Sequence, residues 1–174
     1  MTLKKKIAIS ILIVCNISVA APSIISEKNS QKNNHMQNYS KKRDRYIYQG
    51  VIGALDAYMT YDGGMVGMQS AVKKCYEKIG DEANIEGIKK CFAMDLTSHY
   101  FDVEFSSYMS SHFGSNFPRN QFFLLKNVNI RLLNSFQKHS IEIDRYKDNI
   151  INWVIETQKE YEKNIVHYLK KKED

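Results

Sequence analysis

Apolar residues recur every three or four positions along most of the chain, which is the spacing of one face of an α-helix. The pattern predicts helices over about 41–61, 65–79, from 84 or 85 onward, 118–138, and from 140 or 144 to 170. No run of residues alternates like a half-buried strand for more than a few positions. We therefore expect an all-α domain of about five helices in a bundle or array.

Turn and capping residues set the expected helix ends. Ser40 is placed to cap the first helix, and Asp62-Gly63-Gly64 is a stop signal after it. Residues 100–117 are rich in aromatic residues and serine, so the third helix either continues to about Phe113 or breaks near Ser106. A turn over 114–118 follows in either case, and Pro118 suits the first turn of the fourth helix. The inner face of the fourth helix is expected to carry Phe122, Leu125, Asn129, Leu132, Leu133 and Phe136.

Two glycines stand inside the first predicted helix. Gly50 and Gly53 each cost a helix about 1 kcal/mol relative to alanine. Close approach of another backbone within the domain would compensate, and a docking groove for a partner is the alternative. Internal packing is the favoured interpretation.

The second and third predicted helices form a hairpin with one cysteine in each. A short turn joins them, so they should be antiparallel neighbours. Cys75 lies about one turn before the end of the second helix, and Cys91 lies nearly two turns into the third. Their heights along the hairpin match closely enough for a disulfide between Cys75 and Cys91.

The first 40 residues have the composition of an export signal followed by a linker. Three lysines, an uncharged apolar stretch and small residues at Ser18 and Ala20 predict a cleaved secretory signal peptide over 1–20. Residues 21–40 are polar and predict a disordered linker, which leaves 41–172 as a single helical domain. Lipidation at Cys15 is disfavoured, because Val14 stands where a lipidation box needs Gly, Ala or Ser. The apolar run is too short to span a bilayer, so no membrane span should remain after the signal is removed.

The basic charge of the chain carries little information about partners. The net charge of +6 falls to +3 when the three signal lysines leave. The remaining excess lies at the ends of the domain, at 41–45 and 170–172. The folded part is close to neutral, so we expect no nucleic-acid partner.

One constellation offers a candidate site. Asp95, His99 and Asp102 follow the spacing i, i+4, i+7, so they share a helix side and could act as metal ligands or as a proton relay. The other interpretation is a partly buried histidine beside solvated acids. Nothing elsewhere in the sequence completes a zinc set, and no nucleophile motif or phosphate loop is present. The sequence predicts no metal and no cofactor.

Tyrosine is abundant, with 11 residues in the chain. Several cluster in the first helix and around 100–113, and tyrosine is enriched at protein interfaces because it joins a large apolar body to a polar tip. An ordinary core with hydrated hydroxyls is the alternative. The candidate partner contacts are Tyr46, Tyr58, Tyr61 and Tyr108.

Residues 49–58, QGVIGALDAY, carry a resemblance to a known family. The segment resembles the opening helix of the small helical periplasmic immunity proteins of type VI secretion, which are exported and disulfide-bonded. The resemblance implies a non-enzymatic protein that plugs the active site of a secreted cell-wall hydrolase or similar toxin.

These observations together predict an exported protein-binding domain without catalysis of its own, located in the periplasm or secreted. An immunity or inhibitor protein is the first hypothesis, and its partner would be a secreted toxin or another protein of the cell envelope. The alternatives are an accessory part of a pilus, secretion or conjugation apparatus, a secreted factor directed at a host, and a small enzyme with its site near His99.

Overall fold

The computed structural model describes residues 43–60, 62–80, 85–114 and 116–170. The signal peptide expected over 1–20, Cys15, the linker over 21–40 and Tyr61 lie outside the described residues. No helix in these ranges is both long enough and apolar enough to span a bilayer.

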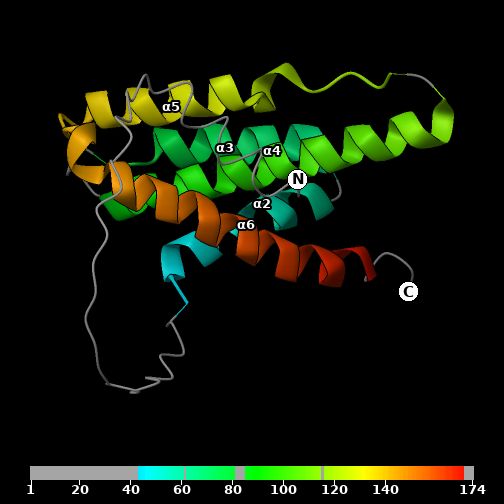
Figure 1. The fold of residues 1–174 in the computed structure, drawn as a ribbon, viewed down its shortest axis with the longest axis horizontal. Coiled ribbons are helices and arrows are strands. Elements are labelled where there is room, and N and C mark those ends of the chain that lie inside the picture. The colour runs from blue at the N-terminus through cyan, green and yellow to red at the C-terminus, as the bar shows by residue number, and fades with distance from the viewer. Residues whose placement is uncertain (1–42, 61, 81–84, 115, 171–174) are drawn as a thin grey trace, which may run out of the picture. The chain divides into compact units, whose positions relative to one another are not determined.

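The described chain is all-α, as the hydrophobic periodicity predicts. Five α-helices and two short 3₁₀ helices follow one another (Figure 1): α2 (Arg45–Met59), α3 (Gly64–Glu77), α4 (Ile85–Phe113), η1 (Gln121–Phe123), α5 (Leu125–Lys138), η2 (Ile143–Tyr146) and α6 (Lys147–Lys170).

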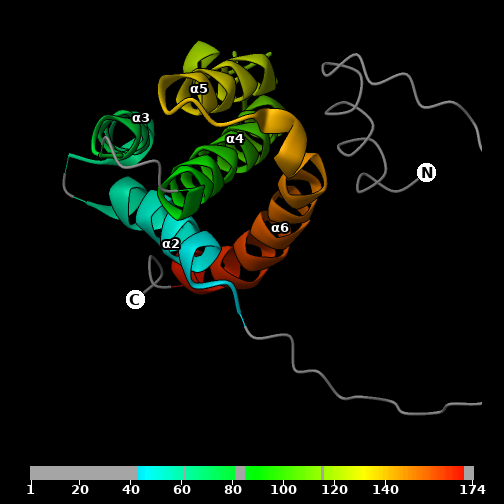
Figure 2. The ribbon, with the colours of Figure 1, turned by 90° about the vertical axis from the view of Figure 1, so that its left-hand side faces the viewer.

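Helix α4 is the axis of the fold. The other four α-helices pack around it, and Figure 2 shows it from one end with α2, α3, α5 and α6 on its sides. Every residue from 91 to 102 is buried, including polar and charged ones. Most buried polar side chains in proteins have a hydrogen-bond partner, and Asp95, Ser98, His99 and Asp102 each have one here. The sequence pattern placed only one face of this helix inward, whereas the structure buries all of its sides.

The packing of α2 on α4 explains the first helical glycine. A Cβ atom added at Gly50 would overlap the backbone carbonyl oxygen of Lys90 and would lie 2.8 Å from the Ala93 Cβ. The two helices approach this closely because Gly50 has no side chain. The preference for internal packing over a docking groove is confirmed at this position.

The disulfide hairpin is confirmed. Cys75 on α3 and Cys91 on α4 are bonded, with their Cα atoms 5.5 Å apart. The bond ties α3 to the central helix, and α3 also packs on α2 and α4 with Met68 and Val72 buried on its apolar side.

Replacing Cys75 with Ser should lower the free energy of unfolding by about 3 kcal/mol, because the unfolded chain then regains the freedom of the loop that the bond closes. Chemical denaturation of the wild type and the variant under oxidising conditions measures this difference. Addition of a reductant should bring the wild type to the level of the variant. Equal midpoints under oxidising conditions would contradict the stabilising role of the bond.

The first helix begins later than the sequence pattern predicted. Arg43 and Asp44 are not helical, so the start at Lys41 is wrong, and the cap is Asp44 rather than Ser40. The Asp44 Oδ1 accepts hydrogen bonds from the N–H groups of Tyr46 and Ile47, at 2.9 and 3.2 Å. Its Oδ2 also pairs with Lys89 at 2.8 Å, which fixes the helix start to α4.

The region around Pro118 also differs from the prediction. The third helix runs unbroken to Phe113, so the chain must come back along it before the next helix begins. Residues 116–120 have no regular secondary structure, and α5 starts at Leu125 rather than near Pro118. The α5 face is also turned relative to the prediction: its buried residues are Val128, Leu132, Ser135 and Phe136, whereas Leu133 is 40% exposed.

Candidate functional site

The C-terminal end of α4 extends beyond the other helices (Figure 1). We call residues 103–113 the arm. Asp102, just before the arm, is 2% exposed, whereas Tyr108 is 57% and Phe113 is 68% exposed. The arm therefore changes from core to surface within a few residues of one continuous helix.

Aromatic rings line the arm. Phe105 packs against Phe101 at its base, with ring centroids 6.3 Å apart, and against Phe117 at 5.7 Å. Tyr108 stacks on His112 at 3.9 Å. From Phe105 to Pro118 the sequence contains no Asp, Glu, Lys or Arg. Beyond Glu104, the arm thus presents large rings and small polar groups and carries no Lys, Arg, Asp or Glu.

Gly114 ends the arm and turns the chain. Its φ angle is +64°, a left-handed conformation that favours glycine, and a glycine there is the usual end of a helix. We call residues 116–123 the return segment. The Ser110 hydroxyl accepts the N–H of Phe117 at 2.9 Å and donates to the Ser106 carbonyl oxygen at 2.7 Å. This hydrogen bond holds the return segment against the arm.

Asp102 fixes the middle of the return segment. Its Oδ2 accepts from the Arg119 Nε, and its Oδ1 accepts from the backbone N–H of Asn120 at 3.1 Å. The Asp102 side chain is 3% and the Arg119 side chain 31% exposed. A charge-assisted pair with one partner buried is stronger than an exposed one.

His99 fixes the next part of the return segment. Its Nδ1 lies 2.7 Å from the carbonyl oxygen of Phe123. A carbonyl oxygen can only accept, so the proton of the neutral ring is on Nδ1. Burial lowers the pKa of His99, and the nearby Arg119 cation acts in the same direction. His99 is therefore held neutral as a donor to the backbone.

Asp95 anchors α5. Arg131 donates to both of its carboxylate oxygens at 2.7 Å, and the Asp95 side chain is fully buried. Arg131 also donates to the Phe122 carbonyl oxygen at 2.8 Å, and its guanidinium lies 3.9 Å from the centre of the Phe122 ring. Burial raises the pKa of Asp95 to about 6, although the Arg131 cation opposes this. The pair is thus mainly ionised at pH 7.

The three residues that the sequence grouped as a candidate site share a different role. Asp95, His99 and Asp102 do lie on one side of α4: Asp102 and His99 bond to the segment that leads from the arm into α5, and Asp95 bonds to Arg131 of α5 itself. Within the described ranges no three His, Cys, Asp or Glu side chains are placed to hold a metal ion. Each of the three side chains holds the chain segments that pack on α4 through at least one hydrogen bond.

Sequence reasoning missed the two arginines that complete this arrangement. Arg119 and Arg131 are basic residues in a stretch without any Asp or Glu, which runs from Glu104 to Glu142. Two acids on a buried helix and two arginines in an acid-free stretch could have suggested the pairs. The i, i+4, i+7 spacing alone gave no sign of them.

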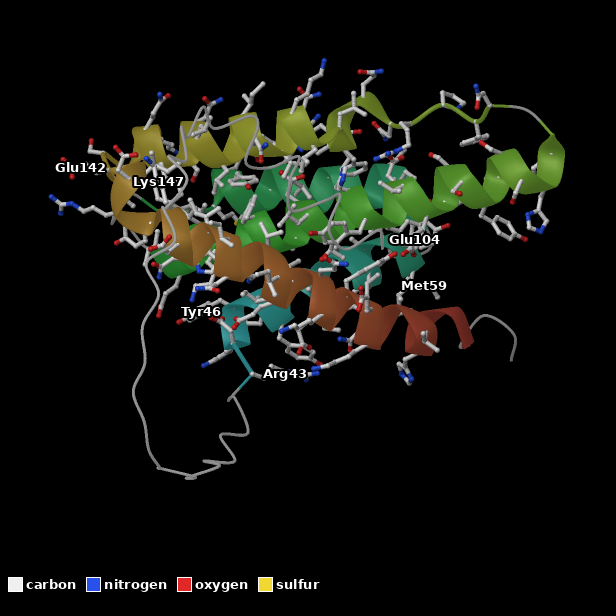
Figure 3. The ribbon with its side chains drawn as sticks, in the orientation of Figure 1. Arg43, Tyr46, Met59, Glu104, Glu142 and Lys147 are labelled. Carbon is white, nitrogen blue, oxygen red and sulfur yellow. A yellow bond between two sulfur atoms is a disulfide. The ribbon has the colours of Figure 1, made fainter. Side chains whose placement is uncertain are left out.

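The three candidate tyrosines that the structure describes do not share one surface. Tyr108 lies on the arm, and Tyr58 packs on Phe101 at its base with ring centroids 4.3 Å apart. Tyr46 lies at the start of α2, far from Glu104 at the beginning of the arm (Figure 3), and Lys89 is 5.6 Å from the centre of its ring. Since a helix rises 1.5 Å per residue, Lys89 and Tyr108 are about 30 Å apart along α4. Of these three, Tyr58 and Tyr108 belong to the arm region and Tyr46 does not.

The lowered pKa of His99 predicts a loss of stability in mild acid. Below about pH 6.5 the unfolded chain binds a proton at this histidine while the folded protein does not, so acidification favours unfolding. The raised pKa of Asp95 acts in the opposite direction below about pH 6.

A variant without His99 separates the effect of this histidine on stability in mild acid from that of Asp95. A His99→Gln variant keeps a donor for Phe123 and lacks the titration, so it should lose less stability than the wild type between pH 7.5 and 5.5. Thermal unfolding of both proteins across this range measures the difference. Parallel pH profiles would contradict the assignment of His99 as a buried neutral donor.

Comparison of the chain with models of protein families, with curated proteins and with solved structures finds no match.

Proposed function

We propose that this protein is an exported, non-enzymatic binding domain that acts in the periplasm as an immunity or inhibitor protein. The observation that carries the proposal is the arm, an exposed aromatic helix end held in place from its base. The resemblance of residues 49–58 to periplasmic immunity proteins points the same way.

The composition of the arm suits protein recognition. Aromatic rings supply large contact areas at a low cost in side-chain entropy, and serine and asparagine supply adaptable hydrogen bonds. The arm and its turn combine Tyr108, Phe113 and Phe117 with four serines over 106–111 and with Asn116. Tyr108, Phe113 and Phe117 are exposed by 57%, 68% and 38%.

The bonds at the base of the arm favour binding by reducing its freedom before contact. The return segment is attached to α4 through Ser110, Asp102 and His99. A segment that is already ordered loses little conformational entropy on binding. The same bonds engage the carboxylate of Asp102 and the Nδ1 of His99 in positioning the return segment, and this supports a role in binding.

The shape of the arm indicates the shape of its target. A projecting helix end reaches most contact area when it enters a concave surface, as long loops of some binding proteins do. A cleft is also where small substrates bind to enzymes. We therefore infer that the arm enters the cleft of a secreted hydrolase or similar toxin and excludes its substrate.

Affinity capture from the cell envelope tests the proposal. The mature protein carries a tag, and mass spectrometry identifies the proteins that remain bound. A matched variant, Tyr108→Ser/Phe113→Ser, changes two exposed side chains of the arm. A second variant, Val66→Ser/Val166→Ser, changes two residues on α3 and α6 that are 75% and 53% exposed.

The wild type and the α3/α6 variant should retain one partner in equal amounts, and the arm variant should retain at least tenfold less. If that partner is a hydrolase or toxin, the wild type should inhibit it and the arm variant should not. Equal retention by both variants would show that the arm is not the contact. An assembly component as the partner would replace the inhibitor role with the accessory one.

A further inference from the structure

Helix α5 presents an outer face with a single sign of charge. No Asp or Glu occurs between Glu104 and Glu142. Two of the basic residues in this stretch, Arg119 and Arg131, are paired with carboxylates of α4. The outward side of α5 is left with Lys126 and Lys138, both exposed.

Apolar residues lie between the two lysines. Ile130 is 50% and Leu133 is 40% exposed, and both share the outward side with Asn134 and Gln137. Steps of three or four residues join Lys126, Ile130, Leu133 and Gln137 along one stripe, and Ile130, Asn134 and Lys138 along the neighbouring stripe of the same outward side. At 1.5 Å per residue, the two lysines are about 18 Å apart along the axis with the apolar pair between them.

The acids closest in sequence to the end of α5 are already paired. Glu142 bonds to Arg145 at 2.7 Å, and Asp144 bonds to Lys147 at 2.8 Å. Figure 3 shows Glu142 and Lys147 at the end where α5 leads into α6. Because the carboxylates of Glu142 and Asp144 are already paired with cations, they offset the charge of Lys138 less. The outer face of α5 therefore stays positive.

Helix α6 provides a contrast. It also exposes apolar residues, with Ile151 and Ile155 at 41% and 43%. Its exposed charged residues, however, include the acids Asp148 and Glu162 as well as Lys159 and Lys163. The outer side of α6 therefore lacks the uniform sign that α5 has.

We infer that the outer face of α5, formed by Lys126, Ile130, Leu133 and Lys138, is a second contact surface for an acidic protein. The matching surface would carry carboxylates opposite the two lysines and an apolar centre between them. This inference rests on the proposed function, and it names the chemistry of the partner beside the cleft that takes the arm.

One partner can touch both surfaces, because the arm and α5 are rigidly connected. The return segment runs directly from one to the other, and Asp95, His99 and Asp102 hold the connection on α4. Positive residues around a neutral contact raise the rate of association with an acidic partner and help to select it. The arm would supply contact area, and the α5 face would supply orientation.

A protein suits this face better than a membrane or a nucleic acid. Two lysines neutralise few phosphates, whereas nucleic-acid binding depends on many such contacts. A helix that lies in a membrane interface needs a broad apolar face with large residues, and the apolar side of α5 is buried against α4.

Zero-length cross-linking in the intact cell envelope tests the inference without knowledge of the partner. A carbodiimide joins lysine amines only to carboxylates in direct contact, and peptide mass spectrometry locates each bond. We expect bonds from Lys126 and Lys138 to another protein, at least fivefold more frequent than from Lys159 and Lys163 of α6. Equal frequencies at the four lysines, or no bond from the α5 pair, would overturn the inference.

Charge reversal gives a second readout. The Lys126→Glu/Lys138→Glu variant should retain at least fivefold less of the captured partner at low salt than the matched Lys159→Glu/Lys163→Glu variant. The gap should narrow at high salt, since added ions screen exposed charges. Equal retention by the two variants would overturn the inference. A membrane would replace the protein partner if two results came together. The wild type but not the α5 variant would bind vesicles of phosphatidylglycerol, and Lys126 and Lys138 would form no cross-link to a protein.

The arm variant separates the two proposals. If Tyr108→Ser/Phe113→Ser abolishes capture while α5 charge reversal has no effect, the proposed function stands and the α5 surface fails. If neither the arm nor α5 contacts another protein in the envelope, both fail.

Discussion

Replacing Arg131 with Met is expected to lower the free energy of unfolding by about 3–5 kcal/mol, the usual cost of removing one partner from a buried ion pair. The loss is large because the Asp95 side chain is fully buried and Arg131 donates a hydrogen bond to each of its carboxylate oxygens. The variant also removes a hydrogen bond to Phe122 and the contact with its ring. Chemical denaturation at pH 7 measures the change.

The pH dependence of this variant provides an independent check. Without Arg131, burial alone acts on Asp95, so its pKa should rise above the value of about 6 that it has in the wild type. A raised pKa means that the folded protein gains stability as the pH falls through it. Arg131→Met should therefore recover part of its lost stability between pH 7 and 5.

The double variant Asp95→Leu/Arg131→Met is the matched control. Two apolar side chains of similar size remove the isolated charge, so the double variant should be more stable than Arg131→Met alone. If Arg131→Met costs less than about 1 kcal/mol, the pair behaves as an exposed one and does not anchor α5.

Replacing Gly50 with Ala should cost about 3 kcal/mol, at the upper end of the usual range for overpacking. The added methyl group would overlap the Lys90 carbonyl oxygen and would lie 2.9 Å from the backbone nitrogen of Met94. Backbone atoms cannot move aside as a side chain can, so α2 and α4 must separate. The melting temperature and the denaturation midpoint should both fall.

Gly53 on the same helix is the control. A Cβ atom there would meet only the terminal methyl of Met94, at 2.7 Å, and this flexible group can rotate away. Alanine also favours a helix over glycine by about 1 kcal/mol, so Gly53→Ala should be close to neutral or stabilising. Equal losses for both variants would mean that the close contact at Gly50 does not determine the packing.

Local signals in the sequence predicted the parts of the fold that local physics determines. The apolar stripe of α3, the stop signal at 62–64 and the matched heights of Cys75 and Cys91 predicted the hairpin and its disulfide, and the structure confirms them. Gly50 predicted a close backbone contact, although the sequence did not indicate which helix supplies it.

Features that depend on tertiary contacts were not predicted. Periodicity assumes that a helix has an outer face, and α4 has none between 91 and 102 because four helices surround it. Asp44 replaces Ser40 as the cap because Lys89 of α4 also binds it. Pro118 is not in a helix, because the chain must come back along the arm before α5 begins.

In the candidate site too, the sequence predicted what is local to one helix and missed what depends on other segments. The spacing of Asp95, His99 and Asp102 correctly placed them on one side of a helix, but their roles depend on Arg119 and Arg131, which come from later segments. The tyrosine content predicted an interface but not its place. The structure shows that α4 is long enough to place Tyr108 far from Tyr46, on the arm.

Site-specific photo-cross-linking tests the arm most directly. A photoreactive phenylalanine analogue replaces Phe113 on the arm or, as a control, Val66 on α3, which is 75% exposed. In living cells, the analogue at Phe113 should give one dominant cross-linked band with another protein, which Tyr108→Ser abolishes, and the analogue at Val66 should give none. Equal cross-linking from both positions, or none from Phe113, would contradict a binding role for the arm.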